Sequence, residues 1–241
     1  MLASLGKAFV PVYRKVRVAV LSTGDELIEL GEPPSPGAII NSNSLAIAAA
    51  VREAGAEPVL LGIARDDPAS HAEKITEGLK ADALITTAGV SAGDRDLVRE
   101  VLAQTGVVSR FWRVDVKPGG PTAFGMKDGK PVFSLPGNPV SALITFEVFV
   151  RPALLRMMGR TRVVRPLVKA TLVGEARKKP GKVHFLRVGI EVRGGEYFAT
   201  SAGDQNTGIL RTMVLADALA VLPADRTSFA AGEKVDLLLP G

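Results

Sequence analysis

The sequence predicts an α/β fold, a mainly parallel sheet with flanking helices, followed by a small all-β domain. Short apolar runs alternate with helix-like segments over about the first 160 residues, a pattern typical of β-α-β units. The remaining residues form short β-rich runs between turns that contain Gly and Pro. A length of 241 residues accommodates one large domain or two modest ones.

Local signals place the first elements. The apolar run Val16–Leu21 is predicted to be a strand, and a helix is expected over 43–54 because Asn43 can cap its first turn. Glu57–Ile63 is the next predicted strand. Asp67 followed by Pro68 supplies a capping carboxylate and a proline at the first helical position, so a second helix is predicted to run to about residue 79.

The same alternation continues toward residue 158. In chain order, the predictions are a strand at Ala83–Thr87, a helix at Asp96–Gln104, an extended segment at Val107–Val116, a strand at Pro131–Leu135 and a long helix that opens at Asn138-Pro139. Pro152 is expected to kink or divide that helix, because its ring removes a backbone donor.

Beyond Gly159 the predicted strands are shorter and no helix signal is strong. They are Leu167–Val173, His184–Val192, Tyr197–Ser201, Ala218–Leu222 and Val235–Leu239. Gly194-Gly195 is predicted to be a hairpin turn. We therefore expect residues 1–15 to be a linker remnant, residues 16–160 a ligand-binding α/β domain, and residues 161–241 a C-terminal β domain.

Composition narrows the chemistry. The absence of cysteine excludes disulfides, zinc–thiolate sites and thiol catalysis, and two histidines leave little for a His-rich site. No run is long and apolar enough to span a membrane, and no secretory signal is evident, so the protein is expected in the cytoplasm. A net charge of +5 favours an anionic partner. With aromatic residues at 5%, nucleic acid is the weakest candidate.

Four polar, glycine-rich loops follow predicted strands, at the edge where open α/β sheets bind ligands. The first contains Ser22, Thr23, Gly24, Asp25 and Glu26. Gly24 lets a ligand approach the backbone, and the two carboxylates suit Mg²⁺. The alternative interpretation is a loop that only caps a short helix.

The second loop follows Ala83–Thr87. Its residues Gly89, Val90, Ser91 and Gly93, with the N-terminus of the next helix, could cradle a phosphate through backbone N–H groups. Asp94 and Asp96 would repel a bare phosphate, so they are expected to bind a metal or the amino and hydroxyl groups of a ligand. Alternatively, Asp96 only caps the helix.

The third and fourth loops add a cation and a helix start. Lys117, Pro118 and Gly119 belong to a stiff Lys-Pro-Gly-Gly-Pro loop whose lysine can face a phosphate or an oxyanion, or can simply be solvated. In the fourth loop Asn138 can cap the following helix or bond a ligand, and Ser141 can reach an anion in the first turn. Capping does not explain Gly137.

Taken together and in this order, the loops resemble those of the MoeA/gephyrin family of molybdopterin molybdenumtransferases. The matching stretches are VLSTGDEL (20–27), INSNS (40–44), REAGAEPVLLGIARDDP (52–68), ITTAGVSAGDRDLV (85–98), FWRVDVKPGGPTAFG (111–125) and FSLPGNPVSALITFEVFVRPAL (133–154). The resemblance is strong over about residues 10–160 and weaker beyond.

The resemblance implies that molybdate is inserted into adenylylated molybdopterin, with release of AMP and with Mg²⁺ as the divalent cation. It implies catalytic roles for Asp25, Asp96 and Lys117, metal binding by Asp25, Glu26, Asp94 and Asp96, and substrate binding by the remaining loop residues named above. It also implies a homodimer and contact with other molybdenum-cofactor biosynthesis proteins. Neither nucleic acid nor a membrane is expected as a partner.

Three departures from the family pattern bear on function. Ala88 stands where the family has glycine, and Gly120 stands where it has a second lysine. About 150 residues that precede this point in the family are not in this sequence, which suggests a fragment, a truncated product or a stand-alone relative. Two alternatives therefore remain open: a molybdopterin adenylyltransferase, and a non-catalytic molybdopterin-binding or scaffold module.

Overall fold

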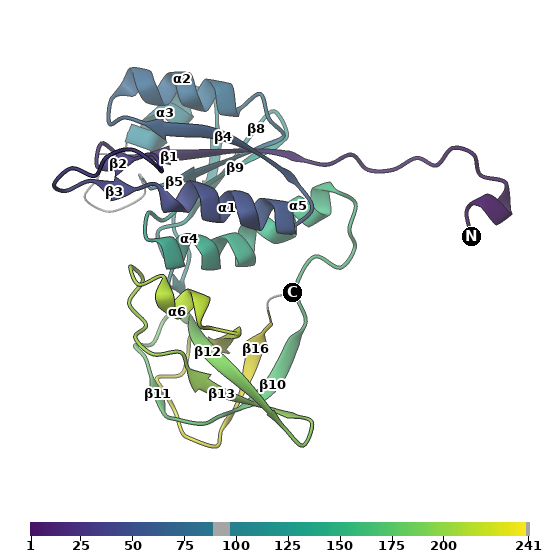
Figure 1. The fold of residues 1–241 in the computed structure, drawn as a ribbon, viewed down its shortest axis with the longest axis vertical. Helices are drawn as coiled ribbons and strands as arrows, with labels where there is room; N and C mark the ends of the chain where they lie inside the picture. Colours follow the sequence, from purple (N-terminus) through teal and green to yellow (C-terminus); the bar gives the residue numbers. More distant parts are fainter. Residues whose placement is uncertain (89–96, 240–241) are drawn as a thin grey trace.

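Two six-stranded sheets organise the computed structural model, which describes residues 1–88 and 97–239 (Figure 1). The first sheet has the strand order β4-β1-β5-β9-β8-β6. In chain order its strands are β1 (Arg17–Thr23), β4 (Glu57–Ala64), β5 (Ala83–Thr87), β6 (Val108–Phe111), β8 (Ala123–Lys127) and β9 (Lys130–Leu135). A small parallel ribbon, β2 (Leu27–Ile28) with β3 (Ile39–Ile40), lies beside it.

The central strands of this sheet confirm the β-α-β prediction. Strand β1 pairs in parallel with both β4 and β5, and β5 pairs in parallel with β9. Strand β8, which the sequence did not indicate, pairs antiparallel with β9 and β6. The sheet is therefore mixed at one edge, and the carboxyl ends of β1, β5 and β9 meet at the same edge.

Helices cover both faces of this sheet. They are α1 (Ser42–Glu53), α2 (Pro68–Gly78), α3 (Leu97–Gln104), α4 (Pro139–Thr145) and α5 (Arg151–Met157). Asp67 caps α2 through the Ser70 N–H at 2.8 Å, as predicted. The predicted cap of α1 was wrong by two residues: Asn41 accepts the Ser44 N–H, so Asn43 lies inside the helix.

The long helix is divided at the position expected from its proline. A π-helical turn, η2 (Phe146–Val150), separates α4 from α5, and Pro152 lies in the first turn of α5. Such a turn adds one residue to the helix. Pro152 then stands in a first turn, where the backbone N–H that proline lacks is not needed. The helix therefore continues across the break, and both halves contribute to the core through Phe146, Val150 and Leu154.

The second sheet closes into a small barrel. Its strands are β7 (Val116–Lys117), β10 (Leu167–Leu172), β12 (Val183–Arg193), β13 (Glu196–Ser201), β14 (Ala218–Leu222) and β16 (Lys234–Leu238). Closure comes from the pairings of β13 with both β10 and β12. The predicted turn at Gly194-Gly195 is confirmed, because both glycines have positive φ and Arg193 pairs with Glu196.

Two features of this half differ from the expectation of an isolated all-β unit. A short helix, α6 (Arg211–Val214), precedes β14. Strand β7 comes from the first half of the chain but pairs with β12, Val116 opposite Val183 and Lys117 opposite His184. A short ribbon of β11 (Ala176–Arg177) and β15 (Ser228–Phe229) completes the barrel end. The loop that carries Lys117 is thus fixed to the C-terminal barrel.

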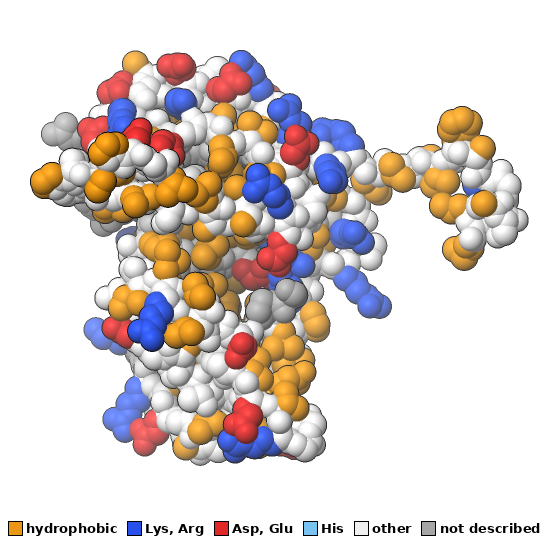
Figure 2. Space-filling model, viewed as in Figure 1, with side chains coloured by type: hydrophobic (Ala, Val, Ile, Leu, Met, Phe, Trp, Pro, Cys, Tyr) orange, Lys and Arg blue, Asp and Glu red, His pale blue; other side chains and the backbone are white. Residues whose placement is uncertain are grey.

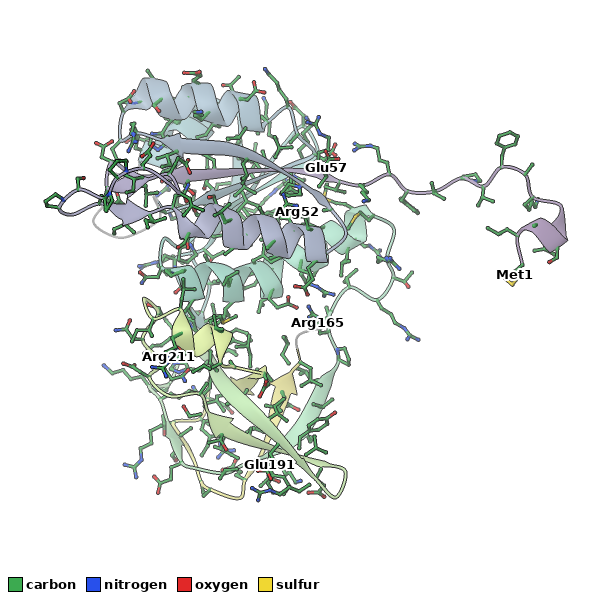
Figure 3. The ribbon with its side chains drawn as sticks, viewed as in Figure 1. Met1, Arg52, Glu57, Arg165, Glu191 and Arg211 are labelled. Carbon is green, nitrogen blue, oxygen red and sulfur yellow. The ribbon has the colours of Figure 1, made fainter. Side chains whose placement is uncertain are left out.

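The two halves pack against each other through apolar side chains. Val140 and Ile144 of α4 form one buried cluster with Phe185, Leu219 and Leu238 of the barrel. Arg165 lies in the connection between the halves (Figure 3). It donates hydrogen bonds to Glu147 of η2 at 2.5 Å and to Glu53 of α1 at 3.2 Å. The barrel is therefore held in contact with α4, beside the edge where the strands end.

The N-terminal segment runs away from this body (Figure 1). It contains a single 3₁₀ turn, η1 (Ala3–Leu5), and its side chains are exposed up to Lys15. Across residues 1–88 and 97–239, none of the helices is long and apolar enough to cross a membrane.

Candidate functional site

The carboxyl edge of the first sheet opens into a pocket of about 560 Å³, which we call the sheet-edge pocket. Its walls come from the β2–β3 ribbon, the start of α1, the ends of β5 and β9, and the barrel. The lining residues are Glu26, Leu27, Ile39, Ile40, Asn41, Ser42, Asn43, Thr87, Ala88, Pro121, Pro136, Gly137, Asn138, Pro139, Ser141, Gly208 and Leu210. The fourth sequence loop, with Gly137, Asn138 and Ser141, thus lies in this pocket.

Side chains from two directions hold that loop. Asn43 donates from Nδ2 to the Gly137 carbonyl at 2.6 Å. Asn138 does not cap α4, contrary to one of the two roles considered for it. Its Nδ2 instead donates to Thr207 Oγ1, across to the barrel, at 2.9 Å. The loop geometry therefore depends on both halves of the protein.

The first loop divides into a buried part and an exposed part. Ser22 and Thr23 are buried at the end of β1 and do not line the pocket. Ser22 Oγ donates to Asn41 Oδ1 at 2.8 Å and shares a hydrogen bond with Thr87 Oγ1 at 3.0 Å. Because Asn41 and Thr87 do line the pocket, Ser22 can act on a ligand only by positioning them.

Acidic groups lie next to this buried part. Gly24 follows β1, and the carboxylate of Glu26 folds back over it, where a Cβ on Gly24 would lie 2.3 Å from Glu26 Oε2. Asp25 is exposed, and its Oδ1 accepts the backbone N–H of Asp66 at 3.1 Å. Asp66, which sequence reasoning did not single out, makes the reciprocal bond to the Asp25 N–H at 3.3 Å.

These carboxylates have the hard oxygen donors that Mg²⁺ prefers. Within the described ranges, however, no cluster of three or more acidic or histidine side chains forms a ready metal site. The predicted ligands Asp94 and Asp96, and the predicted phosphate-binding residues Gly89, Val90, Ser91 and Gly93, lie outside the described residues.

Ala88 adopts the left-handed conformation with a φ of 74°. Its Cβ lies in the wall of the sheet-edge pocket, 3.2 Å from where a Cβ on Gly137 would stand. An alanine in this region costs roughly 1–2 kcal/mol that glycine avoids. The methyl group thus strains the backbone and reduces the space between the second and fourth loops.

Ala88→Gly is therefore expected to raise the free energy of unfolding by about 0.5–1 kcal/mol, since relief of strain exceeds the added freedom of the unfolded chain. Urea denaturation at pH 7 measures this. The matched control is Ala54→Gly, at a residue with a φ of −68° that ends α1, where the same change should destabilise the protein. Destabilisation by both changes would contradict the strain argument.

A second pocket, of about 600 Å³, lies between the third loop and the barrel, and we call it the basic pocket. Lys117 and Pro118 form one wall. The others come from the barrel: Glu175, Ala176, Arg177, Lys178, Lys179, His184, Phe185, Leu186, Arg187, Ser201, Gln205, Thr207 and Leu222. Five of the lining side chains are cationic lysines or arginines and one is a carboxylate, so the pocket is suited to an anion.

Arg187 is the most unusual member of this wall. Its residue exposure is 1%, and it lies on the buried face of β12. One terminal nitrogen, Nη2, donates to the carbonyls of Asp204 at 3.1 Å and Asn206 at 3.3 Å. Its Nε is buried without a partner among the described residues. Burial lowers the pKa of Arg187, although Asp204 partly offsets this, and arginine still carries its charge at neutral pH.

His184 faces the same pocket but contributes no charge at neutral pH. Burial, and then the positive charges of Lys117, Lys178 and Lys182, lower its pKa to about 4. The positive charge of the pocket at pH 7 therefore comes from its lysine and arginine side chains. Gly119, in the third loop, lies in neither pocket wall but packs against Thr145 of α4.

Sequence reasoning missed Arg187 and the barrel residues Gly208 and Leu210. Arg187 had one available signal, a cation at an inward-facing position of a strand, since Phe185 and Arg187 share the buried face of β12. Gly208 and Leu210 had none, because nothing local in their segment indicates contact with a distant loop. Asn41 and Asn43 lie in a stretch already noted for its resemblance, but neither was assigned a role in the site.

The fold is that of a class of proteins whose family model is described as a probable molybdopterin binding domain. Residues 19–156 match the family described as "Probable molybdopterin binding domain", and residues 169–239 match "MoeA C-terminal region (domain IV)". The solved structure of a molybdopterin biosynthesis MoeA protein from Pyrococcus horikoshii covers 99% of this chain with a TM-score of 0.84 and 31% identity.

Two curated relatives point the same way. A molybdopterin molybdenumtransferase from Nostoc is 36% identical over 95% of this chain, and molybdopterin molybdenumtransferase 2 from Mycobacterium tuberculosis is 38% identical over 98%. The chain belongs to the MoeA family of molybdopterin molybdenumtransferases. It spans 54% and 59% of the length of these two relatives, and 57% of the Pyrococcus chain.

Proposed function

We propose that this chain binds adenylylated molybdopterin in the sheet-edge pocket and inserts molybdate, with release of AMP. The observation that carries the proposal is the adjacency of two unlike pockets. The loop from Lys117 to Pro121 lines the basic pocket at one end and the sheet-edge pocket at the other. An oxyanion held on one side of this loop would therefore lie next to a pterin held on the other.

Chemistry supports this division of ligands. The basic pocket is lined by Lys117 and Arg187, two cations that suit a tetrahedral oxyanion such as molybdate. The sheet-edge pocket offers Gly137, Asn138 and Ser141 to the phosphate and the pterin. Asp25 and Glu26 would supply oxygen ligands to Mg²⁺, with Asp94 and Asp96 from the second loop, and the cation would neutralise phosphate charge.

The domain assignment belongs to the same proposal. Residues 16–160 form the molybdopterin-binding domain, residues 161–241 the C-terminal β domain, and residues 1–15 lead into the first. We place the protein in the cytoplasm, in contact with other proteins of molybdenum-cofactor biosynthesis. Molybdate insertion by the purified chain, supplied with adenylylated molybdopterin and Mg²⁺, tests the activity directly. AMP transfer from ATP would favour an adenylyltransferase, and binding without turnover would favour a scaffold module.

Asp96→Asn is expected to reduce turnover at least about tenfold while changing the affinity for molybdopterin much less. The substitution keeps the size of the side chain but removes the charge assigned to metal binding. Single-turnover insertion and equilibrium binding measure the two effects. Asp225→Asn, at an exposed carboxylate of the barrel that lines neither pocket, serves as the control. Equal turnover by Asp96→Asn and the parent would remove Asp96 from the mechanism.

The homodimer that the family resemblance implies is also part of the proposal. Figure 2 shows hydrophobic side chains gathered over the β2–β3 ribbon and α1, and Leu30, Ile39, Ile40 and Leu45 are exposed there. Sedimentation velocity is expected to give twice the chain mass at micromolar concentration, and Ile39→Lys is expected to shift the species toward the monomer. A monomeric parent at all concentrations would contradict this part.

A further inference from the structure

One short segment of the barrel, residues 204–210, forms a wall of both pockets. Gln205 and Thr207 line the basic pocket, whereas Gly208 and Leu210 line the sheet-edge pocket. No strand or helix covers residues 204–210 until α6 begins at Arg211. The segment is therefore positioned by its turns and by the hydrogen bonds at its two ends.

Arg187 holds the end that faces the basic pocket. Its Nη2 donates to the carbonyls of Asp204 and Asn206 at 3.1 and 3.3 Å. The Gln205 side chain pairs with the backbone of the same residue, accepting the Arg187 N–H at 3.0 Å and donating to the Arg187 carbonyl at 3.2 Å. An anion in the basic pocket that bound the guanidinium of Arg187 would fix this side chain, and with it the segment.

Thr207 holds the end that faces the sheet-edge pocket. Its Oγ1 accepts Asn138 Nδ2 at 2.9 Å, and its carbonyl accepts the Val140 N–H at 3.4 Å. Thr207 lines the basic pocket and not the sheet-edge pocket, whereas the reverse is true of Asn138. The hydrogen bond between these two side chains is thus a direct contact between the walls of the two pockets.

We propose that an oxyanion in the basic pocket and a pterin phosphate in the sheet-edge pocket bind cooperatively, and that the Asn138–Thr207 hydrogen bond carries the coupling. The inference rests on the ligands assigned under the proposed function. Each ligand orders the same segment, so the second ligand meets a wall that the first has already fixed. Thr207 is a positioning residue in this scheme, because it acts on the pterin phosphate through Asn138.

Calorimetric titration of the full chain with molybdate, alone and in the presence of saturating molybdopterin, measures the coupling. We expect the Kd for molybdate to fall by about fivefold or more when molybdopterin is bound, and the Kd for molybdopterin to fall by the same factor when molybdate is bound. Thr207→Val, which keeps the shape but removes the acceptor, should bring this factor close to one. Thr207→Ser, which keeps the hydroxyl, should retain it.

The ratio is taken within each variant, so a change in the separate affinities does not affect the comparison. Binding of both ligands to the parent with no change in either Kd, or with weaker binding of the second, would overturn the inference and leave the proposed function standing. A coupling factor retained in Thr207→Val would also overturn it. Failure of molybdate or molybdopterin to bind at all would overturn the proposed function and the inference with it.

A second readout needs molybdate alone. The side-chain amide of Asn138 and the backbone amide of Val140 both bond to Thr207, and neither residue lines the basic pocket. Molybdate is expected to shift the NMR signals of both groups in the parent and in Thr207→Ser. In Thr207→Val the Asn138 signal should no longer respond. An unresponsive Asn138 signal in the molybdate-saturated parent would contradict the proposed coupling through the Asn138–Thr207 hydrogen bond.

Discussion

Arg187→Met is expected to weaken molybdate binding by at least about tenfold, the most that we expect from any single side chain of the basic pocket. Arg187 is the buried cation of that pocket, and its Nε has no partner among the described residues. A hydrogen bond to a charged group in such surroundings contributes roughly 1.5–3 kcal/mol. Methionine fills similar space but offers no donor, so the variant loses the bond to the anion together with the Nη2 bonds to the Asp204 and Asn206 carbonyls.

The matched control is Arg177→Met, which removes the same charge from the same pocket. Arg177 is exposed and bonded to Glu175 at 3.2 Å, so solvent already screens its charge. We expect less than about a threefold change there. Calorimetry with molybdate measures both variants, and thermal unfolding checks that each remains folded. Equal losses in the two variants would show that the pocket attracts anions by overall charge and contains no dedicated oxyanion site.

The case of Arg187 also shows where prediction from sequence stops. The strand that carries it was predicted with nearly its observed bounds, because apolar alternation is a local pattern. Whether an inward-facing arginine is a buried ligand or a solvated end residue depends on what lies opposite. In this protein the carbonyls of Asp204 and Asn206 lie there, about 20 residues away in sequence. No local rule contains that information.

The candidate site likewise has features that the sequence predicts and features that it does not. The loops after β1, β5 and β9 could be located because parallel strands end at one edge, and the fourth loop does lie in the sheet-edge pocket. The buried position of Ser22 could not be predicted, since it depends on Asn41 and Thr87 closing over it. The contribution of the barrel to the site could not be predicted either, because the hydrogen bond from Asn138 to Thr207 joins residues from the two halves.

Strand β8 gives a third example, at the level of the fold. Its sequence, AFGMK, alternates weakly and contains a glycine, so propensity alone did not indicate a strand. The glycine is tolerated because the space beside it is filled: a Cβ on Gly125 would lie 2.8 Å from Val107 Cγ1. Close packing against its neighbour, rather than intrinsic preference, therefore determines this strand.

Gly119→Ala is expected to lower the free energy of unfolding by about 2–4 kcal/mol and to impair both molybdate binding and turnover. Gly119 has a φ of 104°, a conformation that L side chains rarely adopt, and a Cβ there would lie 2.1 Å from Thr145 Cγ2. Thr145 cannot simply rotate away, because its Oγ1 donates to the Ser141 carbonyl at 2.8 Å. The loop must therefore move, and Lys117 with it.

Two further variants separate the causes of this loss. Thr145→Ser removes Cγ2 but keeps Oγ1, so combining it with Gly119→Ala should restore roughly 1–2 kcal/mol and leave the backbone strain. Gly129→Ala has a φ of 78° but no atom within 4 Å of its Cβ, so it should cost only about 1 kcal/mol and leave turnover unchanged. Urea denaturation and molybdate titration measure all three variants. If Gly119→Ala costs no more than Gly129→Ala, the contact with Thr145 does not set the position of the Lys117 loop, and the adjacency of the two pockets must depend on the barrel alone.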